Sequence, residues 1–376
     1  MNPRGIHLQY SFEARGQGGA EIENPLFDLL SAVQAAGSIS HAAQQLQQSY
    51  RHVWGSLKRW EGVLGNELVV WAKGQPARLT PFAERLLWAE RQARARMTPH
   101  VEALRAELSR VFALADDPTL QLLEVFASHD LALPQLQQLA EQAQGVHIGL
   151  RFAGSQEALR CLMDGRCTVA GFHVPRGAAA GSGFAKALRP LLRPGEHKLI
   201  GSHSRRQGLM LREAVAQEAG PLGAAGLALL QALAAGRWRF VNRQPGSGTR
   251  LLLDDLLAAQ GLDAAAIDGY ATRTEDTHVA VAAAVAAGAA DIGLGVEAAA
   301  RASGLHFVPL AEEEYYLVCL KARLDTTAML SLRAALASPA WAQALQALPG
   351  YAPQQAGQVL SLTRALPWWR YARPAA

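Results

Sequence analysis

Residues 38–60 read SISHAAQQLQQSYRHVWGSLKRW, and residues 67–80 read ELVVWAKGQPARLT. The first stretch predicts a short helix capped by Ser40, a turn, and a second helix that begins at Tyr50 with Ser49 as its N-cap. The second stretch is typical of a strand, a tight turn and another strand. Together they predict a winged helix-turn-helix, a motif whose second helix enters the major groove of DNA.

The residues on either side complete this small domain. Upstream, Gly37 is placed to end a helix, and apolar residues before it repeat at the spacing of one helix face. These residues are Leu26, Leu29, Leu30 and Val33. Downstream, Thr80 and Pro81 predict the start of a long helix that runs toward Leu114 and is broken or kinked at Thr98-Pro99.

The predicted recognition region avoids negative charge. From Ala32 through Trp60 the sequence contains neither Asp nor Glu. Since a helix that lies against phosphates must avoid carboxylates, this pattern favours DNA contact over a merely solvated basic face. The residues expected to face DNA are Ser38, Ser40, Ser49, Tyr50, Arg51, His52, Ser56, Lys58, Arg59, Lys73 and Arg78.

These stretches also resemble a known family. SISHAAQQL, QSYRHVWGSLKRWE and RLTPFAERLL are similar to the N-terminal domain of ModE-type molybdate-responsive regulators and, more distantly, to LysR-type regulators. The residues that favour the ModE type are Ser49, Tyr50, Arg51 and Trp54. The resemblance implies binding to double-stranded operator or promoter DNA, and assembly into a homodimer or homotetramer through the long helix.

From Leu120 onward the pattern changes to strands that alternate with helices. The predicted strands are LQLLEVFA, VHIGLRF, CTVAGFHV, WRFVN and ADIGLG. This alternation is typical of an α/β domain with mainly parallel strands, and about 200 residues suit two lobes.

Four short polar segments are predicted to lie just after strands and at the starts of helices. A helix N-terminus favours anions because its free N–H groups and its dipole face outward, and Gly lets the backbone approach a ligand. We therefore expect these segments to converge on a small oxyanion. The candidate residues in these segments are Ser128, His129, Asp130, Ser155, Ser247, Gly248, Thr249, Arg250, Thr277 and His278, and the family resemblance described below implies Arg243 as a further one.

Each candidate also has an ordinary structural interpretation. Ser-Gly-Thr at a helix start is more often a cap than a ligand site. Arg243 and Arg250 are structural if they pair with a carboxylate such as Asp254. His129 is structural if it is a satisfied buried histidine. Asp130 would repel a fully ionised oxyanion, unless it caps its own helix or accepts a proton from the ligand.

The second half of the chain resembles a known kind of domain. ASHDLAL, AGFH, RFVNRQPGSGTRLLLDDLL, THVAVAAAVAAGAADIGLG and FVPLAEEEYYLV are similar to the periplasmic-binding-protein-like domain found fused to ModE-type regions. The resemblance implies a two-lobed type II fold that closes on molybdate or tungstate, with no other cofactor.

The expected fold is therefore multidomain. We expect a winged helix-turn-helix, mainly α with a β-wing, at residues 1–82. A linker or dimerisation helix follows at 83–116, and a two-lobed α/β anion-sensing domain at 117–376. Closure of the lobes would then change the spacing of two recognition helices in the oligomer and so the affinity for DNA.

Composition narrows the class of protein further. A net charge of +4 permits a polyanionic partner without requiring one. The three cysteines form no CxxC motif, so we expect no metal cation site, and their number fits a reducing compartment. The N-terminus has no apolar signal region and no stretch is apolar enough for a membrane span, so we expect a cytoplasmic protein without a membrane partner.

The sequence also bears on three other functions: an enzyme, a LysR-type regulator of a different ligand, and a molybdate store. Adjacent Ser128, His129 and Asp130 cannot form a catalytic relay, and no GxSxG elbow is present, so we do not expect an enzyme. A LysR-type regulator that senses a small organic acid is the alternative, and RNA polymerase is a further partner if the protein activates transcription. A molybdate store without a DNA role is disfavoured by the winged helix.

Overall fold

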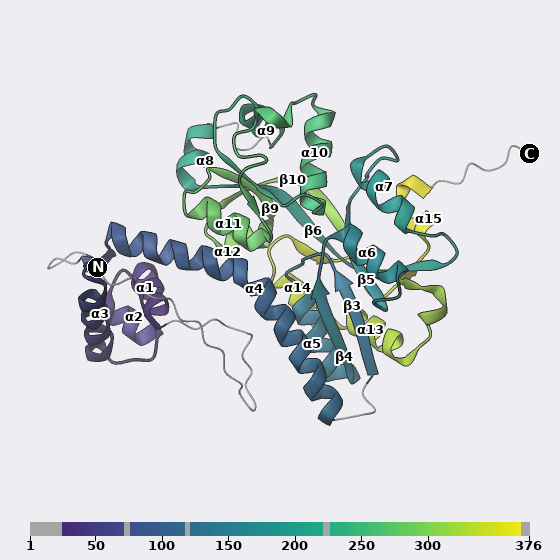
Figure 1. Cartoon of the computed structure of the whole chain (residues 1–376), viewed down its shortest axis with the longest axis horizontal. Helices are drawn as coiled ribbons and strands as arrows, with labels where there is room; N and C mark the ends of the chain where they lie inside the picture. The colour runs from purple at the N-terminus through teal and green to yellow at the C-terminus, as the bar shows by residue number, and fades with distance from the viewer. Residues whose placement is uncertain (1–24, 71–75, 117–120, 221–225, 370–376) are drawn as a thin grey trace, which may run out of the picture.

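A helical domain with a two-stranded wing forms the N-terminal part of the computed structural model, which describes residues 25–70, 76–116, 121–220 and 226–369 (Figure 1). Its elements are α1 (Pro25–Ala36), α2 (Ile39–Gln45), α3 (Tyr50–Leu64), β1 (Val69–Val70) and β2 (Arg78–Leu79). The two strands are antiparallel, and the predicted apolar face of α1 is buried against α2 and α3. The helix-turn-helix with its wing is confirmed.

The capping residues follow the prediction at two of three positions. Gly37 ends α1 in the left-handed conformation, with φ of 60°, and Ser49 caps α3 by accepting the N–H of His52. The cap of α2 is Ser38 and not Ser40, because Ser38 directly follows the turn at Gly37 and is extended. Ser40 instead lies exposed inside α2.

The linker helix α4 (Pro81–Asp116) is 36 residues long and continues through position 99. Of the two predicted alternatives at Thr98-Pro99, a break or a kink, the break is therefore wrong. Thr98 Oγ1 donates to the carbonyl of Arg94 at 2.8 Å, so the turn before the proline keeps an additional hydrogen bond. Packing of α4 along α11 and β4 also stabilises the helix through its tertiary contacts.

The C-terminal domain has two lobes built on one curled sheet of strand order β4-β3-β5-β10-β6-β9-β7-β8. Lobe I contains β3 (Gln121–Ala127), β4 (Val146–Phe152), β5 (Val169–Pro175), α5 (Leu133–Gln144), α6 (Ser155–Met163), α7 (Gly183–Leu188), α13 (Thr327–Ala337), α14 (Pro339–Gln346), β11 (Tyr351–Pro353), β12 (Val359–Leu360) and α15 (Leu362–Ala365). Lobe II contains α8 (Glu213–Ala219), α9 (Gly226–Ala234), β7 (Phe240–Arg243), α10 (Gly248–Ala259), β8 (Thr274–Glu275), α11 (His278–Ala286), β9 (Ile292–Val296) and α12 (Glu297–Ala302).

Two long antiparallel strands, β6 (His197–Leu211) and β10 (His306–Leu320), cross from one lobe to the other (Figure 1). β10 pairs with β5 in lobe I, and β6 pairs with β9 in lobe II. The prediction of mainly parallel strands holds on both flanks of the sheet, but the centre is antiparallel. The crossing strands allow one sheet to serve two lobes.

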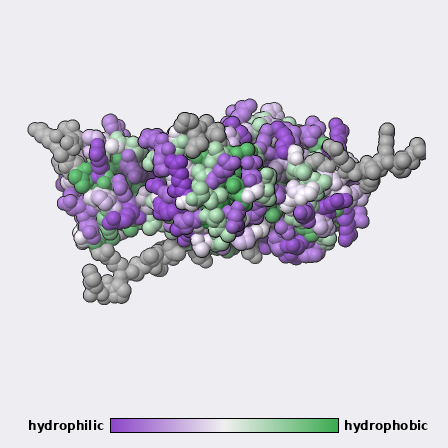
Figure 2. Space-filling model, turned by 90° about the horizontal axis from the view of Figure 1, so that it is seen from above, coloured by the Kyte–Doolittle hydropathy of each residue, from purple (hydrophilic) through white to green (hydrophobic). Residues whose placement is uncertain are grey.

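Apolar side chains fill separate cores in the helical domain and on the two faces of each lobe. Helices cover both faces of the sheet, which explains the almost continuous burial of β5 and β9. On the face shown in Figure 2, hydrophilic residues cover much of the surface, with hydrophobic residues between them.

Candidate functional site

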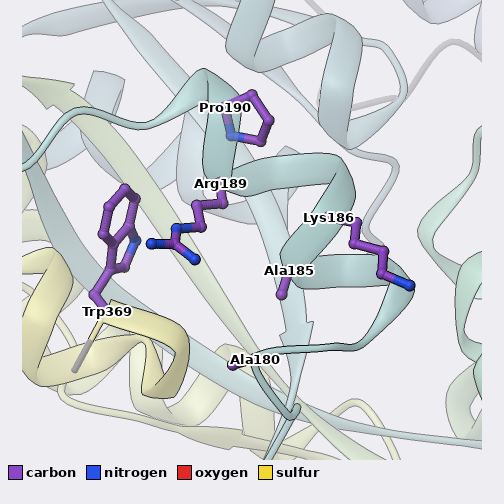
Figure 3. Close-up of a pocket in the computed structure, with 6 residues that line it drawn as sticks. All are labelled: Ala180, Ala185, Lys186, Arg189, Pro190 and Trp369. Atoms are coloured by element: carbon purple, nitrogen blue, oxygen red, sulfur yellow. The ribbon is translucent and has the colours of Figure 1, made fainter.

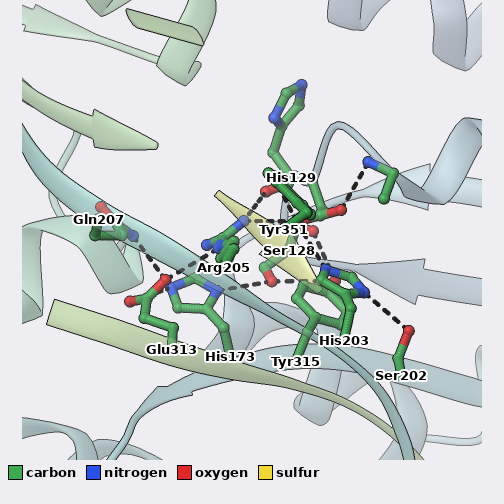
Figure 4. Close-up of polar contacts among 12 residues, drawn as sticks. Ser128, His129, His173, Ser202, His203, Arg205, Gln207, Glu313, Tyr315 and Tyr351 are labelled. Atoms are coloured by element: carbon green, nitrogen blue, oxygen red, sulfur yellow. Dashed lines mark hydrogen bonds and ion pairs between the residues drawn. The ribbon is translucent and has the colours of Figure 1, made fainter. Parts of the chain in front are cut away.

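A row of buried polar side chains occupies one face of the crossing strands. His203, Arg205 and Gln207 follow one another at every second position of β6, so they point to the same side of the sheet. Glu313 and Tyr315 of β10 are the register partners of Arg205 and His203. These five side chains form the floor of a site between the lobes (Figure 4).

Arg205 is the centre of this floor and is fully buried. Its Nη1 lies 2.8 Å from Asp130 Oδ2, and its Nε lies 3.0 Å from Glu313 Oε2. Burial disfavours the charged form of Asp130, but His203 and Arg205 outweigh it and hold the pKa of Asp130 below its usual range. One guanidinium thus contacts both carboxylates, and its Nη2 has no hydrogen-bond partner among the described residues.

His173, at the end of β5, connects the floor to lobe I. Its Nδ1 lies 3.1 Å from Ser128 Oγ, and Ser128 in turn contacts the hydroxyl of Tyr315. Its Nε2 lies 3.7 Å from Glu313 Oε1. Burial lowers the pKa of His173 to about 4, so the ring is neutral at pH 7 and acts by hydrogen bonding.

Lobe II reaches the floor through the N-terminus of α10. Ser247 caps this helix, and Thr249 Oγ1 accepts a hydrogen bond of 3.0 Å from Gln207 Nε2. Gly248 lies so close to His173 that a Cβ there would be 2.0 Å from the ring Nε2. The two lobes therefore touch at this point, and glycine is required for the approach.

Arg243, at the end of β7, is buried at 4% exposure and has no carboxylate within ion-pair distance among the described residues. Its Nη2 donates to the carbonyl of Asp276 at 2.7 Å, and its Nε donates to Gln244. Burial, reinforced by the positive charge of Arg205, lowers the pKa of Arg243 to about 9. The guanidinium remains charged at pH 7, and the carboxylates of Asp276 and Glu313 act on it only from beyond ion-pair distance.

Three more groups in this region carry buried polar atoms without partners among the described residues: Ser155 Oγ, His129 Nδ1 and His278 Nδ1. Ser155 begins α6, and His278 begins α11 after the cap Thr277. The rings of His129 and His278 are 6.4 Å apart, one from each lobe. Burial followed by the charge of Arg243 lowers the pKa of both histidines, that of His129 to about 3.

Most of the predicted ligand residues meet in this region, but two groups of them differ from the expected geometry. The segment Ser128-His129-Asp130 follows β3 as expected but does not begin a helix, since α5 starts at Leu133. Asp130 accepts the N–H of Ala132 in addition to pairing with Arg205. Arg250 is engaged elsewhere, 3.4 Å from Asp254 and with its guanidinium 3.7 Å from the ring centre of Tyr270.

Several residues of the site were missed at the level of sequence. They are His173, His203, Arg205, Gln207, Glu313, Tyr315 and Tyr351. The available signal was HSRRQ within an apolar run of strand length, since charged residues are rarely buried unless they are paired or bind a ligand.

The predicted DNA-facing residues of α2 and α3 lie on an open surface. Tyr50, Arg51, His52 and Arg59 are exposed, and Ser56 is half-buried. Lys58 is also exposed but pairs with Glu61 and lies over the ring of Trp54. Arg78 is exposed on the wing strand β2, and Lys73 lies outside the described residues.

A separate hollow of about 470 Å³ lies on lobe I between α7 and the short 3-10 helix Pro367–Trp369 (Figure 3). It is lined by Lys186, Arg189 and Trp369, and Arg189 stacks on the indole at 5.1 Å. The described part of the chain contains no cluster of His, Cys, Asp and Glu suited to a metal ion, and none of its helices is long and apolar enough to cross a bilayer.

Comparison with known protein families finds matches to two parts of the chain. Residues 136–337 match the PBP superfamily domain. The chain belongs to the PBP superfamily. Residues 26–84 match the bacterial regulatory helix-turn-helix of the lysR family. A PBP domain joined to such a helix-turn-helix is the arrangement of a LysR-type transcription regulator with a ligand-binding domain.

Two curated relatives have no function in their names. The uncharacterized protein YvgK of Bacillus subtilis (strain 168) is 30% identical over 210 residues, which cover 56% of this chain and 64% of YvgK. An uncharacterized protein from the 5' region of a 2Fe-2S ferredoxin gene of Clostridium pasteurianum is 32% identical over 112 residues, covering 30% of this chain and 98% of that protein.

Among solved structures, an H2O2-bound cysteine-to-serine mutant of OxyR from Corynebacterium glutamicum is similar. It is 16% identical with a TM-score of 0.42, covering 86% of this chain and 92% of that one.

Proposed function

We propose that this chain is an anion-responsive transcription regulator of the ModE type, in which a small oxyanion bound between the lobes changes the affinity for operator DNA. The observation that carries this proposal is Arg243, which is buried and charged without a carboxylate partner among the described residues. A buried charge without a counterion is costly, so an anionic ligand gains most of its affinity here.

The surroundings of Arg243 support an oxyanion. The N-termini of α6, α10 and α11 offer free N–H groups, and Ser155 Oγ and Arg205 Nη2 are further donors without partners among the described residues. We propose molybdate or tungstate as the first ions to test, on the resemblance of the sequence to molybdate-responsive regulators. The remaining proposed contacts are Ser128, His129, Ser247, Gly248, Thr249, Thr277 and His278, whereas Asp130 is paired with Arg205 and would position that side chain.

The DNA-binding side of the proposal rests on the exposed basic surface of α3 and the wing. We place DNA binding in residues 1–82, the linker in 83–116 and the sensor in 117–376. A symmetric dimer or tetramer would present paired recognition helices to operator half-sites in the cytoplasm. RNA polymerase is a partner if the protein activates.

A small organic acid is the second candidate ligand, and one observation favours it. Glu313 Oε1 and Gln207 Oε1 are buried acceptors without a hydrogen-bond partner among the described residues. A hydroxy acid or amino acid can donate to them, whereas a fully deprotonated oxyanion cannot.

Calorimetric titration of the full chain compares the two candidate classes of ligand, oxyanions and small organic acids. The ligands are molybdate, tungstate, sulfate, phosphate and a set of small hydroxy and amino acids. We expect saturable binding of molybdate or tungstate. Arg243→Gln should weaken this binding at least tenfold, because the countercharge is lost, whereas Arg237→Gln, which removes a surface arginine from the same lobe, should leave it unchanged.

If an organic acid binds and no oxyanion does, the second candidate ligand is correct and the oxyanion proposal is wrong. If the wild type and Arg243→Gln bind the oxyanion with equal affinity, Arg243 is not part of its binding site. Fluorescence anisotropy with a duplex selected from a randomised library then measures whether the bound ligand changes DNA affinity.

A further inference from the structure

A buried carboxylate of lobe II is held by the linker helix. Glu275, at the end of β8, is 5% exposed. Arg96 of α4 donates to it twice, from Nε at 2.9 Å and from Nη2 at 2.6 Å, and Gln92 donates to Oε1 at 3.2 Å. Two parallel bonds from one guanidinium fix the orientation of the carboxylate as well as its distance.

Small side chains bring the two helices together beside this ion pair. Ala95 of α4 packs with Ala280 and Ala283 of α11 in a buried cluster of their own. Because none of these side chains extends beyond Cβ, α4 lies directly against α11. A shift of either helix would therefore displace the other.

The same carboxylate belongs to the segment that forms the ligand site. Glu275 is the register partner of Arg243 in the pair β7–β8, and the next carbonyl, that of Asp276, accepts from the Arg243 guanidinium. Thr277 then caps α11, and His278 is buried in the site. Four consecutive residues thus join the contact with α4 to the groups around the proposed anion.

The linker helix also reaches the other lobe, since α4 packs along β4 (Figure 1). A helix that contacts both lobes must move against at least one of them when the lobes move. We propose that Arg96 and Glu275 form the contact through which the state of the ligand-site segment 275–278 is transmitted to α4, and through α4 to the DNA-binding domain. This regulatory role rests on the proposed function for its ligand.

Two variants distinguish the effect of the position of segment 275–278 on anion binding from the effect of the charge of Glu275. Arg96→Met leaves the carboxylate of Glu275 without its main partner, which releases the segment and also adds an uncompensated negative charge near the site. Glu275→Gln releases the segment but removes that negative charge. Both variants therefore weaken anion binding if position matters, whereas charge alone predicts that Glu275→Gln strengthens it.

Hydrogen exchange of the full chain, without any ligand, tests the contact directly. We expect Arg96→Met to speed amide exchange at least threefold both in residues 90–97 and in residues 275–281. Arg301→Met is the control, because Arg301 is likewise an exposed arginine (53%) paired with a buried glutamate of lobe II, Glu297 (7%), whose other ion-pair partner among the described residues is Arg206 and not a residue of α4. Unchanged exchange in residues 275–281 of Arg96→Met would overturn the proposal.

Titration with molybdate, tungstate and the organic acids completes the test. If the wild type binds one of them, both variants should raise its Kd several-fold and abolish its effect on affinity for the library-selected duplex, while Arg301→Met behaves as wild type. Unchanged coupling to DNA in Arg96→Met overturns the proposal even if exchange changes. If no ligand binds, the proposed function fails, and the exchange data alone decide whether α4 and the segment are coupled. Arg96 is 55% exposed, so its substitution creates no buried cavity.

Discussion

Burial sets the protonation of the histidines that surround the interlobe site. The pKa of His129 falls to about 3 and that of His173 to about 4, and that of His278 also lies well below its usual range. At pH 7 these rings are uncharged, so the positive charge offered to a ligand comes from Arg243, because Arg205 is already paired with Asp130 and Glu313. The histidines contribute direction through hydrogen bonds rather than net attraction.

This predicts a specific dependence of stability on pH. Between about pH 4 and 6.5 the unfolded chain binds protons at His129 that the folded chain excludes, so the free energy of unfolding rises with pH in this window. Each such histidine adds a slope of up to about 1.4 kcal/mol per pH unit. Urea unfolding of wild type and His129→Gln at several pH values measures the slope, which should be smaller in the variant. Equal slopes would contradict the assignment.

Gly248 is the residue where the lobes approach most closely at the site. Gly248→Ala places a methyl group 2.0 Å from His173 Nε2, which forces α10 away from β5. We expect the affinity for the proposed anion to fall about tenfold, as expected for an overpacking cost of about 1–3 kcal/mol. Gly181→Ala is the control, since a Cβ there meets no atom within 4 Å. Calorimetry distinguishes the two, and wild-type affinity in Gly248→Ala would show that this contact is not needed for binding.

At the scale of elements, periodicity and caps were sufficient to predict most helices and strands. The apolar spacing of α1, the cap Ser49 and the alternating strands of the α/β domain were read correctly because they depend on neighbours in sequence. The course of α4 through Pro99 depends instead on its contacts with α11 and β4. For the same reason, the pairing of Arg205 with Asp130 and Glu313 joins residues that lie far apart in the chain and was not foreseen.

The exposed face of α3 carries the prediction for DNA binding. Arg51 is exposed, with no ion pair to another described residue, so its charge is available to phosphate. Arg51→Ala should weaken DNA binding and reduce the slope of log Kd against log salt by about 0.9, the value for one phosphate contact. Fluorescence anisotropy from low to moderate salt measures the slope. Arg237→Ala, on lobe II, should leave it unchanged, and an unaltered slope in Arg51→Ala would remove this residue from the interface.

At the scale of the whole molecule, separate cores predict separate unfolding transitions. The core of the helical domain shares no residue with the cores of the lobes. Leu30→Ala, at a fully buried position of that core, should cost about 2–5 kcal/mol and lower only the transition of the helical domain. The proposed anion at about 100 times its Kd should raise only the other transition, by about 2.7 kcal/mol. Scanning calorimetry resolves both effects, and a single transition that shifts in both experiments would contradict independent cores.

The crossing strands also impose an order on synthesis. The two cores of lobe II draw their buried residues from the continuous stretch 209–308, whereas lobe I pairs β5 with residues 313–318 and β6 with residues 351–360. A ribosome therefore releases a complete helical domain first and a complete lobe II next, while the early strands of lobe I wait for the end of the chain. During that interval the edge of β5 is unpaired, so it is the place where a nascent chain needs protection from aggregation.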